Sequence, residues 1–417
     1  MERILFRGAR LLDGTSPSRP GTSVLIEGER IRALGPDGEL SPAPGDRVID
    51  LAGKTLMPGL ICAHYHAAYD DVTLQPVPLG TERPHGYLAI AAARNVERAL
   101  LCGFTSVVSA GGPHNIDAEL KQAIEAGLID GPRIVAGSRG LDTVGDYNDI
   151  GPWWWELGNP GANRYCNGAD GFREAARDEI RIGAEIIKIF PAGGHGIPEP
   201  ETTRGLTRDE LRAVVEATHD RGRKIRAHCP WKKLILECIE VGVDVIDHGD
   251  RMDAEVIQAM VESGTFLAPS MLFLARLLGD AENRAAATAA QLAPIQDDFE
   301  NMCKWLPEAS AAGVKIVLGD DYGTILLPHG RYADELELYV ERVGIDPLEV
   351  IRWGTRNGAE LMGRADELGT LEPGKLADLL VIDGDPSSDV RVLQQPERLV
   401  AILKDGAFKK DRLQPPA

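Results

Sequence analysis

Two histidines at the end of a short apolar segment are the first residues whose spacing suggests chemistry. His64 and His66 lie two positions apart after residues 60–63, a predicted β-strand. Side chains two positions apart on a strand point to the same face, and neutral imidazoles side by side suit an ion of the zinc type. Nine histidines in 417 residues give roughly 0.2 such pairs by chance, so this short motif can be a false positive. Two hydrogen-bonded histidines at a strand end are therefore an alternative.

Further side chains that can bind metal occur at the ends of other predicted strands. His228 and His248 end two consecutive strands, and Asp320 and Asp321 follow the last one. Lys188 lies among isoleucines, where a charged ammonium is costly unless it is paired, neutral or modified. One hypothesis is a salt bridge to a neighbouring carboxylate. The other is carbamylation by carbon dioxide, since burial favours the neutral amine that this reaction needs.

Carbamylation would give Lys188 a carboxylate that can bridge two metal ions. His228 and His248 would then bind the second ion, and one of the two aspartates would complete the first site. Either Asp320 or Asp321 could fill that place, and the other could contact a ligand or the substrate.

These side chains need a scaffold that brings strand ends together. The middle of the chain alternates short β-type segments with helical stretches, which is typical of a parallel α/β fold. Eight strands are predicted, at residues 60–64, 105–108, 133–136, 185–189, 224–228, 244–248, 265–268 and 315–319. One predicted helix covers 207–221, where Thr207 and Glu210 have capping-box spacing and Gly222 follows.

Eight strand–helix units predict a (β/α)8 TIM barrel, in which catalytic groups lie at the carboxyl ends of the strands. An open doubly wound sheet is the alternative, but no glycine-rich dinucleotide loop follows the first strand. Both ends of the chain contain short strand-like runs separated by turns and prolines. We expect residues 1–56 and 365–417 to form one small β-sandwich domain, and residues 57–364 to form the barrel.

Composition limits the partners of the protein. The chain has 45 Lys+Arg and 64 Asp+Glu, a formal charge of −19, without a basic cluster. This balance disfavours nucleic acid and anionic membrane surfaces. The chain has no apolar run long enough to span a bilayer, and its first residues do not resemble a secretory signal. Six cysteines without CxxC spacing indicate reduced thiols in the cytoplasm and argue against a cysteine zinc site.

Several segments resemble the metal-dependent amidohydrolase superfamily. Met57-Pro58-Gly59-Leu60-Ile61-Cys62-Ala63-His64-Tyr65-His66 is similar to the family's Pro-Gly-Leu-Ile-Asp-x-His-x-His opening. The resemblance continues in strand order through residues 185–188, 226–228, 245–249, 319–323 and 371–379, and thus covers nearly the whole chain. The branch it resembles contains imidazolonepropionase-like and prolidase-like enzymes (Xaa-Pro or Xaa-Arg dipeptidases), with amidases of the ochratoxin type nearby.

The resemblance implies a binuclear hydrolase that cleaves an amide or peptide-like C–N bond of a small molecule through a metal-bridging hydroxide. Two divalent ions, zinc or else manganese, cobalt or iron, would share carbamylated Lys188. The first would be bound by His64, His66 and Asp321, and the second by His228 and His248. Asp321 is preferred over Asp320 because it fits the family match and the Asp-x-Gly turn. It would take a proton and pass it to the leaving nitrogen as general acid.

Other activities fit the same motifs. A lactonase or an imidazolone-type cyclic amide hydrolase could use the same binuclear site. Deaminases of the superfamily usually run on one metal and lack the lysine bridge, so Lys188 argues against them. A non-catalytic scaffold homologue is a remote alternative, because every expected ligand position holds a competent side chain. The resemblance is also compatible with a homo-oligomer.

Substrate contacts are expected in the loops that follow the strands. Asp146 stands where prolidase-like members often have a histidine, and Asp320 adds a negative charge near the site. His195 and His329 lie in such loops and would contact substrate or be held by packing. Tyr147 and the run Trp153-Trp154-Trp155 follow the third strand, where they would form an apolar lid or pack the loop.

Overall fold

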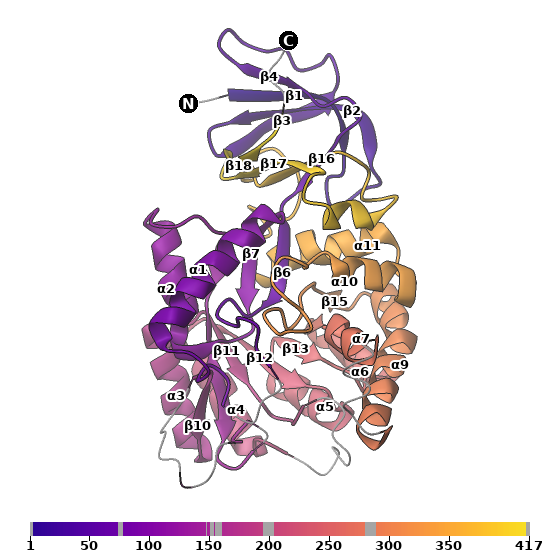
Figure 1. The fold of residues 1–417 in the computed structure, drawn as a ribbon. Helices are drawn as coiled ribbons and strands as arrows, with labels where there is room; N and C mark the ends of the chain where they lie inside the picture. Colours follow the sequence, from indigo (N-terminus) through magenta and orange to yellow (C-terminus); the bar gives the residue numbers. More distant parts are fainter. Residues whose placement is uncertain are drawn as a thin grey trace.

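A closed barrel of parallel strands, surrounded by helices, forms the larger part of the molecule (Figure 1). The structure is a computed structural model that describes residues 3–73, 78–146, 148–150, 154, 161–194, 204–279 and 289–413, without the side chains of 289–291. The short parallel strands and the helices around them form a TIM barrel, so the predicted fold is confirmed.

The barrel strands follow one another in chain order. They are β6 (Leu60–Tyr65), β7 (Phe104–Ser109), β8 (Arg133–Val135), β9 (Gly137–Thr143), β11 (Ile186–Ile189), β12 (Lys224–Cys229), β13 (Val245–His248), β14 (Phe266–Ala268) and β15 (Lys315–Ile316). Only Ala136 separates β8 from β9, so the two occupy successive parts of one barrel position. The backbone of Ala63 donates to the carbonyl of Leu318 at 2.6 Å and joins the last position to the first.

The third barrel position extends further than the sequence pattern predicts. The prediction ended at residue 136, whereas β9 continues to Thr143 and carries β10 (Asn163–Cys166) beside it. The added stretch contains Gly137 and Gly140, which weaken strand propensity. Their missing side chains leave room for Ser109 and for the ring of Phe190. Tertiary contacts therefore decide this strand.

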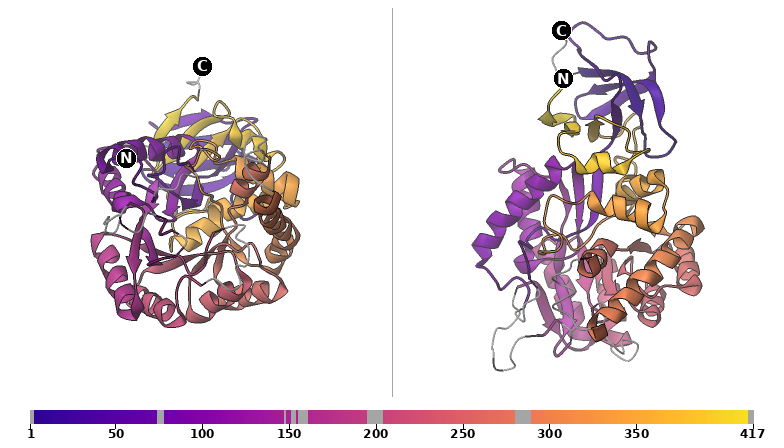
Figure 2. Two further views of the ribbon diagram at one scale, coloured as in Figure 1. Left: turned by 60° about the horizontal axis from the view of Figure 1, so that its bottom comes forward. Right: turned by 45° about the vertical axis from the view of Figure 1, so that its right-hand side comes forward.

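Helices enclose the barrel as a ring, which the left view of Figure 2 shows. They are α1 (His85–Leu101), α2 (Ile116–Glu125), α3 (Gly168–Ile182), α4 (Arg208–His219), α5 (Lys232–Val241), α6 (Ala254–Ser263), α7 (Met271–Gly279), α9 (Ala289–Ala312), α10 (Asp334–Glu337), α11 (Pro347–Arg352) and α12 (Gly358–Leu361). The predicted capping box is present at α4: Thr207 accepts from the backbone of Glu210, whose carboxylate accepts from the backbone of Thr207. None of the described helices is long and apolar enough to cross a membrane.

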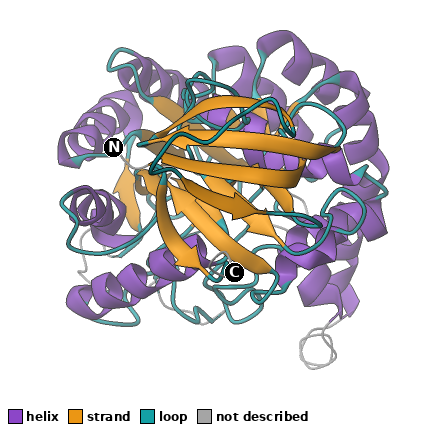
Figure 3. Cartoon of the chain, turned by 90° about the horizontal axis from the view of Figure 1, so that it is seen from above, coloured by secondary structure: helices purple, strands orange, loops and turns teal. Residues whose placement is uncertain are grey.

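Both ends of the chain meet in a second, mixed sheet of eight strands (Figure 3). Its members are β1 (Arg3–Leu11), β2 (Arg19–Glu27), β3 (Arg30–Pro36), β4 (Arg47–Asp50), β5 (Thr55–Pro58), β16 (Leu379–Ile382), β17 (Leu399–Lys404) and β18 (Ala407–Asp411). β5 pairs with β16, so the two ends are interleaved. Arg47 of β4 contacts Asp411 and Phe408 of β18, and the bent sheet encloses its own apolar core.

This sheet lies at the amino ends of the barrel strands. The backbone of Gly59, just before β6, donates to the carbonyl of Asp378 at 2.9 Å. Arg133, at the start of β8, pairs with Asp378 and Asp405. The carboxyl ends of the barrel strands therefore open on the face away from the sheet, as Figure 1 shows. That face is where a barrel enzyme holds its catalytic groups.

Candidate metal centre and active site

Three of the predicted ligands converge at the carboxyl face of the barrel. His64 lies in β6, His66 directly after it, and Asp321 after β15. The Nε2 atoms of His64 and His66 lie 3.1 and 3.2 Å from the same oxygen, Oδ1 of Asp321. Among the described residues, this is the one group of three potential ligands whose donor atoms all lie within 4.8 Å of one another. Two imidazoles and a carboxylate are a donor set that suits a divalent ion of the zinc type.

The backbone around Gly111 fixes the orientation of His66. Nδ1 of His66 donates to the carbonyl of Gly111 at 2.7 Å, and since a carbonyl only accepts, the neutral ring carries at Nε2 the lone pair with which a histidine binds a metal. Gly111 has φ +102°, in the left-handed region that favours glycine. Its own N–H donates to Ser109 Oγ at 2.9 Å, and Ser109 in turn bonds Asp117. The ligand is thus held in the tautomer that a metal requires.

A buried carboxylate lies behind the other histidine. Oδ1 of Asp247 lies 3.3 Å from Nδ1 of His64, and Nε of Arg226 donates to Oδ2 of the same carboxylate at 3.0 Å. Arg226 also donates to the carbonyls of Ala63 and Ser109, each at 2.8 Å, and so ties β12 to β6 and β7. Burial raises the pKa of Asp247, but Arg226 and Lys188 outweigh it and hold the pKa well below its usual range. A carboxylate behind a ligating imidazole orients the ring and increases its basicity.

Lys188 makes a salt bridge to a neighbouring carboxylate, which was the first of the two hypotheses for this residue. Its Nζ donates to Oδ2 of Asp247 at 2.6 Å, and both side chains are buried. Burial lowers the pKa of Lys188. The negative charge of Asp247 raises the pKa again, but by less than burial lowers it. The backbone N–H of Lys188 donates to Ser138 Oγ at 2.9 Å, which sets the register of β11 against β9. The amine is therefore an ion-paired group at the carboxyl face of the barrel, and its burial makes loss of the proton easier than in an exposed lysine.

The histidines of β12 and β13 continue the cluster. The ring centroids of His228 and His248 lie 4.4 Å apart, and that of His248 lies 5.4 Å from the ring of His64. His248 has φ +74°, which is rare for a residue with a side chain and is a form of strain that functional sites often contain. The structure therefore gathers all four predicted histidine ligands on one face, although their assignment to metals stays a prediction.

The adjacent aspartates Asp320 and Asp321 face different surroundings. Asp320 is buried and accepts the backbone N–H of Leu272 at 2.7 Å, at the start of α7. Burial raises its pKa well above the ordinary value, and the charges of Glu335 and Asp321 raise it further. Burial also raises the pKa of Asp321, but the adjacent rings of His64 and His66 outweigh this and hold it well below the usual range. Asp321 faces the histidines, whereas Asp320 stabilises the helix behind them.

His329 contacts two neighbouring tyrosines in this structure. Its Nε2 donates to the backbone carbonyl of Tyr69 at 3.0 Å, and its Nδ1 accepts from the hydroxyl of Tyr332 at 2.9 Å. Burial lowers its pKa from 6.5 to about 4, so the ring is neutral at physiological pH. A direct contact of His329 with substrate stays a prediction.

The other predicted substrate residues lie around the loop after β9. Asp146 is half-buried beside Asp142, whose pKa burial and the neighbouring Asp146 raise to about 8. Trp154 is 65% exposed. Tyr147, Trp153, Trp155 and His195 lie outside the described residues. Contacts of Asp146 and Trp154 with substrate stay predictions.

Two aromatic residues at the site were missed by the sequence analysis. The ring of Tyr69 stacks on His66 at 4.2 Å between centroids, and the ring of Phe190 stacks on His228 at 5.3 Å. Both follow a ligand-bearing strand by a few positions, which is the one sequence signal that could have indicated them.

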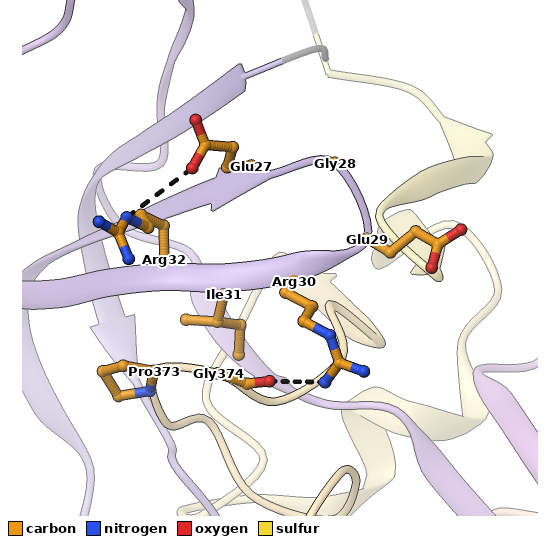
Figure 4. A pocket seen from close by; sticks show the side chains of 8 residues that line it. All are labelled: Glu27, Gly28, Glu29, Arg30, Ile31, Arg32, Pro373 and Gly374. Carbon is orange, nitrogen blue, oxygen red and sulfur yellow. Dashed lines mark hydrogen bonds and ion pairs between the residues drawn. The ribbon is translucent and has the colours of Figure 1, made fainter.

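A hollow on the surface of the second sheet is a separate feature (Figure 4). It lies at the hairpin between β2 and β3, beside Pro373 and Gly374. Its two arginines are occupied: Arg30 donates to the carbonyl of Gly374 at 2.7 Å, and Arg32 lies 3.7 Å from Glu27. The hollow belongs to the sheet at the amino ends of the barrel strands, so it is no part of the histidine cluster.

Comparisons with known proteins agree with this geometry. The model of the amidohydrolase family matches residues 55–408. Ochratoxinase from Aspergillus niger is 29% identical over 377 residues, which cover 85% of this chain and 75% of the relative. Imidazolonepropionase from Rubrobacter xylanophilus is 25% identical over 417 residues, covering 93% and 90%. A crystal structure of a prolidase complexed with N-methylphosphonate-L-proline is 29% identical, with a TM-score of 0.86, and covers 98% of this chain and 100% of that one.

The family match spans the barrel together with β5, β16 and β17 of the second sheet, and the prolidase structure covers 98% of the chain, so the predicted relationship is confirmed. Enzymes of this family generally use divalent metal ions and act on small molecules, and the converging imidazoles and carboxylate fit such an ion. The chain belongs to the amidohydrolase family, as a metal-dependent hydrolase that acts on carbon–nitrogen bonds.

Proposed function

We propose that the protein is a binuclear amidohydrolase with a carbamylated lysine. His64, His66 and Asp321 hold one divalent ion, His228 and His248 hold the second, and the carbamate of Lys188 bridges them. Zinc is the first choice, and manganese, cobalt and iron suit the same ligands. One observation carries the proposal: both Nε2 atoms of the β6 histidines lie within 3.2 Å of a single oxygen of Asp321.

The surroundings of Lys188 support its carbamylation. The reaction requires the neutral amine, whose nitrogen lone pair adds to the carbon of carbon dioxide while the nitrogen loses a proton. Burial lowers the pKa of Lys188 and so favours this form. When Lys188 leaves Asp247, that carboxylate keeps its contacts with Arg226 and His64. Asp247 therefore keeps a counter-charge after the modification, and the negative charge of the carbamate would be balanced by the divalent ions.

The reaction is the hydrolysis of an amide or peptide-like bond. Divalent ions, when bound, acidify a water molecule and polarise the carbonyl of the substrate. Asp321 remains ionised because of its histidine contacts, so one of its oxygens accepts the proton of the attacking water and delivers it to the leaving nitrogen. Asp247 keeps His64 in place, and the carbonyl of Gly111 does the same for His66.

The names of the relatives support this substrate class. They include an ochratoxinase, a prolidase and an imidazolonepropionase. Because one relative is an imidazolonepropionase, hydrolysis of a cyclic amide is the second candidate reaction. Lactone hydrolysis would use the same groups.

Metal removal and reloading test the proposal. Protein stripped with a chelator should lose hydrolysis of amides, and zinc or manganese with bicarbonate should restore it at two ions per chain. The panel should contain N-acyl amino acids, Xaa-Pro and Xaa-Arg dipeptides, aryl amides, cyclic amides and lactones. A ¹³C carbamate signal should disappear in Lys188→Met. Cleavage of lactones alone, or activity that survives without metal, would contradict the proposal. His219→Ala, on the outer helix α4, is the control for His228→Ala.

Two further expectations belong to this proposal. We expect residues 1–56 and 365–417 to constitute the small domain and 57–364 the catalytic barrel; the pairing of β5 with β16 supports a small domain built from both ends, although β5 continues to Pro58. The protein acts in the cytoplasm, where its six free cysteines would stay reduced.

A further inference from the structure

The histidines of the site belong to a longer series of rings. Neighbouring ring centroids lie between 4.2 and 5.4 Å apart in the order Phe190, His228, His248, His64, His66, Tyr69. An aromatic ring therefore lies at each end of the series. Phe190 lies beside His228, and Tyr69 lies beside His66.

Tyr69 is held firmly at its end of the series. Its backbone carbonyl accepts from His329 at 3.0 Å and from Asn95 at 3.2 Å, and its N–H donates to the carbonyl of His66. Gly323, with φ +103°, provides the space, since a Cβ there would lie 2.5 Å from the Cβ of Tyr69. The ring lies nearly parallel to that of His66, at an interplanar angle of 7°.

Phe190 occupies a comparable seat at the other end. A Cβ on Gly140 would lie 2.4 Å from Cε2 of Phe190, so only glycine allows the ring to lie there. The backbone N–H of Phe190 donates to the carbonyl of Leu141 at 3.2 Å, and Nζ of Lys188 lies 5.2 Å from the centre of the ring. Each aromatic ring thus depends on a glycine of a neighbouring strand or loop.

Tyr69 and Phe190 are partly accessible residues, unlike several other tyrosines of the barrel. Tyr65, Tyr322 and Tyr332 are fully buried, whereas Tyr69 and Phe190 are only partly covered. The hydroxyl of Tyr69 bonds none of the described residues. Rings with one face on a histidine and an accessible remainder are suited to contact a ligand.

Cations that follow the barrel strands are occupied by carboxylates. Arg204 pairs with Glu237, Arg251 with Asp298 and Arg276 with Asp334, at distances of 2.6 to 2.7 Å. These arginines are therefore not available to bind an anionic substrate without losing an ion pair. Within the described part of the chain, the ring surfaces are better placed to recognise a substrate.

We infer that Tyr69 and Phe190 contact the substrate and select amides that carry a flat apolar group beside the scissile carbon–nitrogen bond. The inference rests on the proposed function, because it names the substrate class of the same site. Tyr69 presents its ring and a hydroxyl that bonds no other described residue at one end, and Phe190 presents an apolar ring at the other. His329 and Asn95 act through Tyr69 and are positioning residues.

Equilibrium binding of two metal-chelating probes tests this inference. Benzohydroxamate and acetohydroxamate share the chelating group and differ in the ring, so calorimetry on the metal-loaded protein measures the contribution of the ring. We expect wild type to bind benzohydroxamate with a Kd about tenfold lower than that for acetohydroxamate. This ratio corresponds to roughly 1.4 kcal/mol, the size of an aromatic contact. Tyr69→Ala and Phe190→Ala should each reduce this preference several-fold at unchanged metal content. Tyr87→Ala, which removes a half-exposed tyrosine on α1, is the matched control and should keep it.

Conservative variants separate contact from folding. Tyr69→Phe and Phe190→Tyr keep a ring and should keep most of the preference, whereas Tyr69→Leu and Phe190→Leu keep the bulk and should lose it. Hydrolysis should show the same pattern as a KM for anilides that rises relative to the KM for acetamide-type substrates. Equal binding of the two probes by wild type, or an unchanged preference in both leucine variants, would overturn the inference while leaving amide hydrolysis intact. Metal-loaded protein that prefers benzohydroxamate but hydrolyses no amide would overturn the proposed function instead.

Discussion

Lys188 donates to Asp247 at 2.6 Å in the interior of the barrel, where neither side chain reaches solvent. The same carboxylate accepts from Arg226 and lies 3.3 Å from Nδ1 of His64. One anion of β13 thus faces two cationic side chains and a predicted metal ligand, from three other strands. Because buried charges are costly without partners, this arrangement connects the stability of the barrel to the geometry of its active site.

Asp247→Asn should destabilise the protein strongly. It leaves Lys188 and Arg226 buried without their counter-ion, which typically costs about 3–5 kcal/mol. Urea unfolding followed by circular dichroism measures the loss. Glu240→Gln breaks the exposed ion pair with Arg208 and should cost less than about 1 kcal/mol. A loss for Asp247→Asn as small as that of the control would show that Asp247 does not compensate these cations.

Lys188→Met should separate activity from stability. Methionine has a similar length and no charge, and Asp247 keeps its contacts with Arg226, so the unfolding free energy should fall less than in Asp247→Asn. Turnover of amides should fall at least about 100-fold, the scale of losing a group that acts on the reacting atoms, together with bound metal. Inductively coupled plasma analysis and steady-state kinetics measure both. A methionine variant with full metal content and activity would exclude the carbamate bridge.

The two adjacent aspartates should behave in opposite ways. Asp321→Asn removes the carboxylate that contacts His64 and His66, so metal content and kcat should fall at least about 100-fold. Asp320→Ala leaves the N–H of Leu272 buried without its acceptor, which should cost about 1–3 kcal/mol of stability with metal content retained. Metal analysis and urea unfolding on both variants check this. If Asp320→Ala lost its metal and Asp321→Asn kept it, the choice between the two residues would be wrong.

The sequence analysis could bring the predicted metal ligands to one face because a barrel converts strand ends into a common face. His64, His66, His228 and His248 each end or follow a short apolar segment, and that local pattern suffices to place them. Asp321 was distinguished from Asp320 by family resemblance, and the structure gives the physical difference: one carboxylate faces imidazoles and the other faces the start of α7.

Contacts that depend on barrel closure could not be predicted in this way. Asp247 is adjacent to His248 in sequence, yet its partners come from β6, β11 and β12. The stacking of Tyr69 and Phe190 depends on space left by Gly323 and Gly140, which are distant in the chain. The length of β9 also depends on such packing, since its glycine content argues against a strand.

His329→Gln should change the pH dependence of stability. Burial lowers the pKa of His329 from 6.5 to about 4, so above pH 6.5 the ring is neutral in the folded and the unfolded chain and has no effect. As the pH falls below 6.5, the unfolded chain binds a proton first, and the folded state loses stability until the pH reaches about 4. The full loss is about 3 kcal/mol. Glutamine does not titrate, and its amide can still donate to the carbonyl of Tyr69.

Urea unfolding of wild type and His329→Gln at about pH 7 and pH 4.5 measures this difference. The loss of unfolding free energy between the two conditions should be about 2–3 kcal/mol smaller in the variant. His219→Gln replaces a more exposed histidine on the outer helix α4. It shows how much the pH dependence of stability changes when a histidine outside the core is lost. If His329→Gln lost as much stability on acidification as wild type, the ring would be protonated in the folded protein well above pH 4. Its Nδ1 could then no longer accept from Tyr332, and the anchoring of Tyr69 would need another explanation.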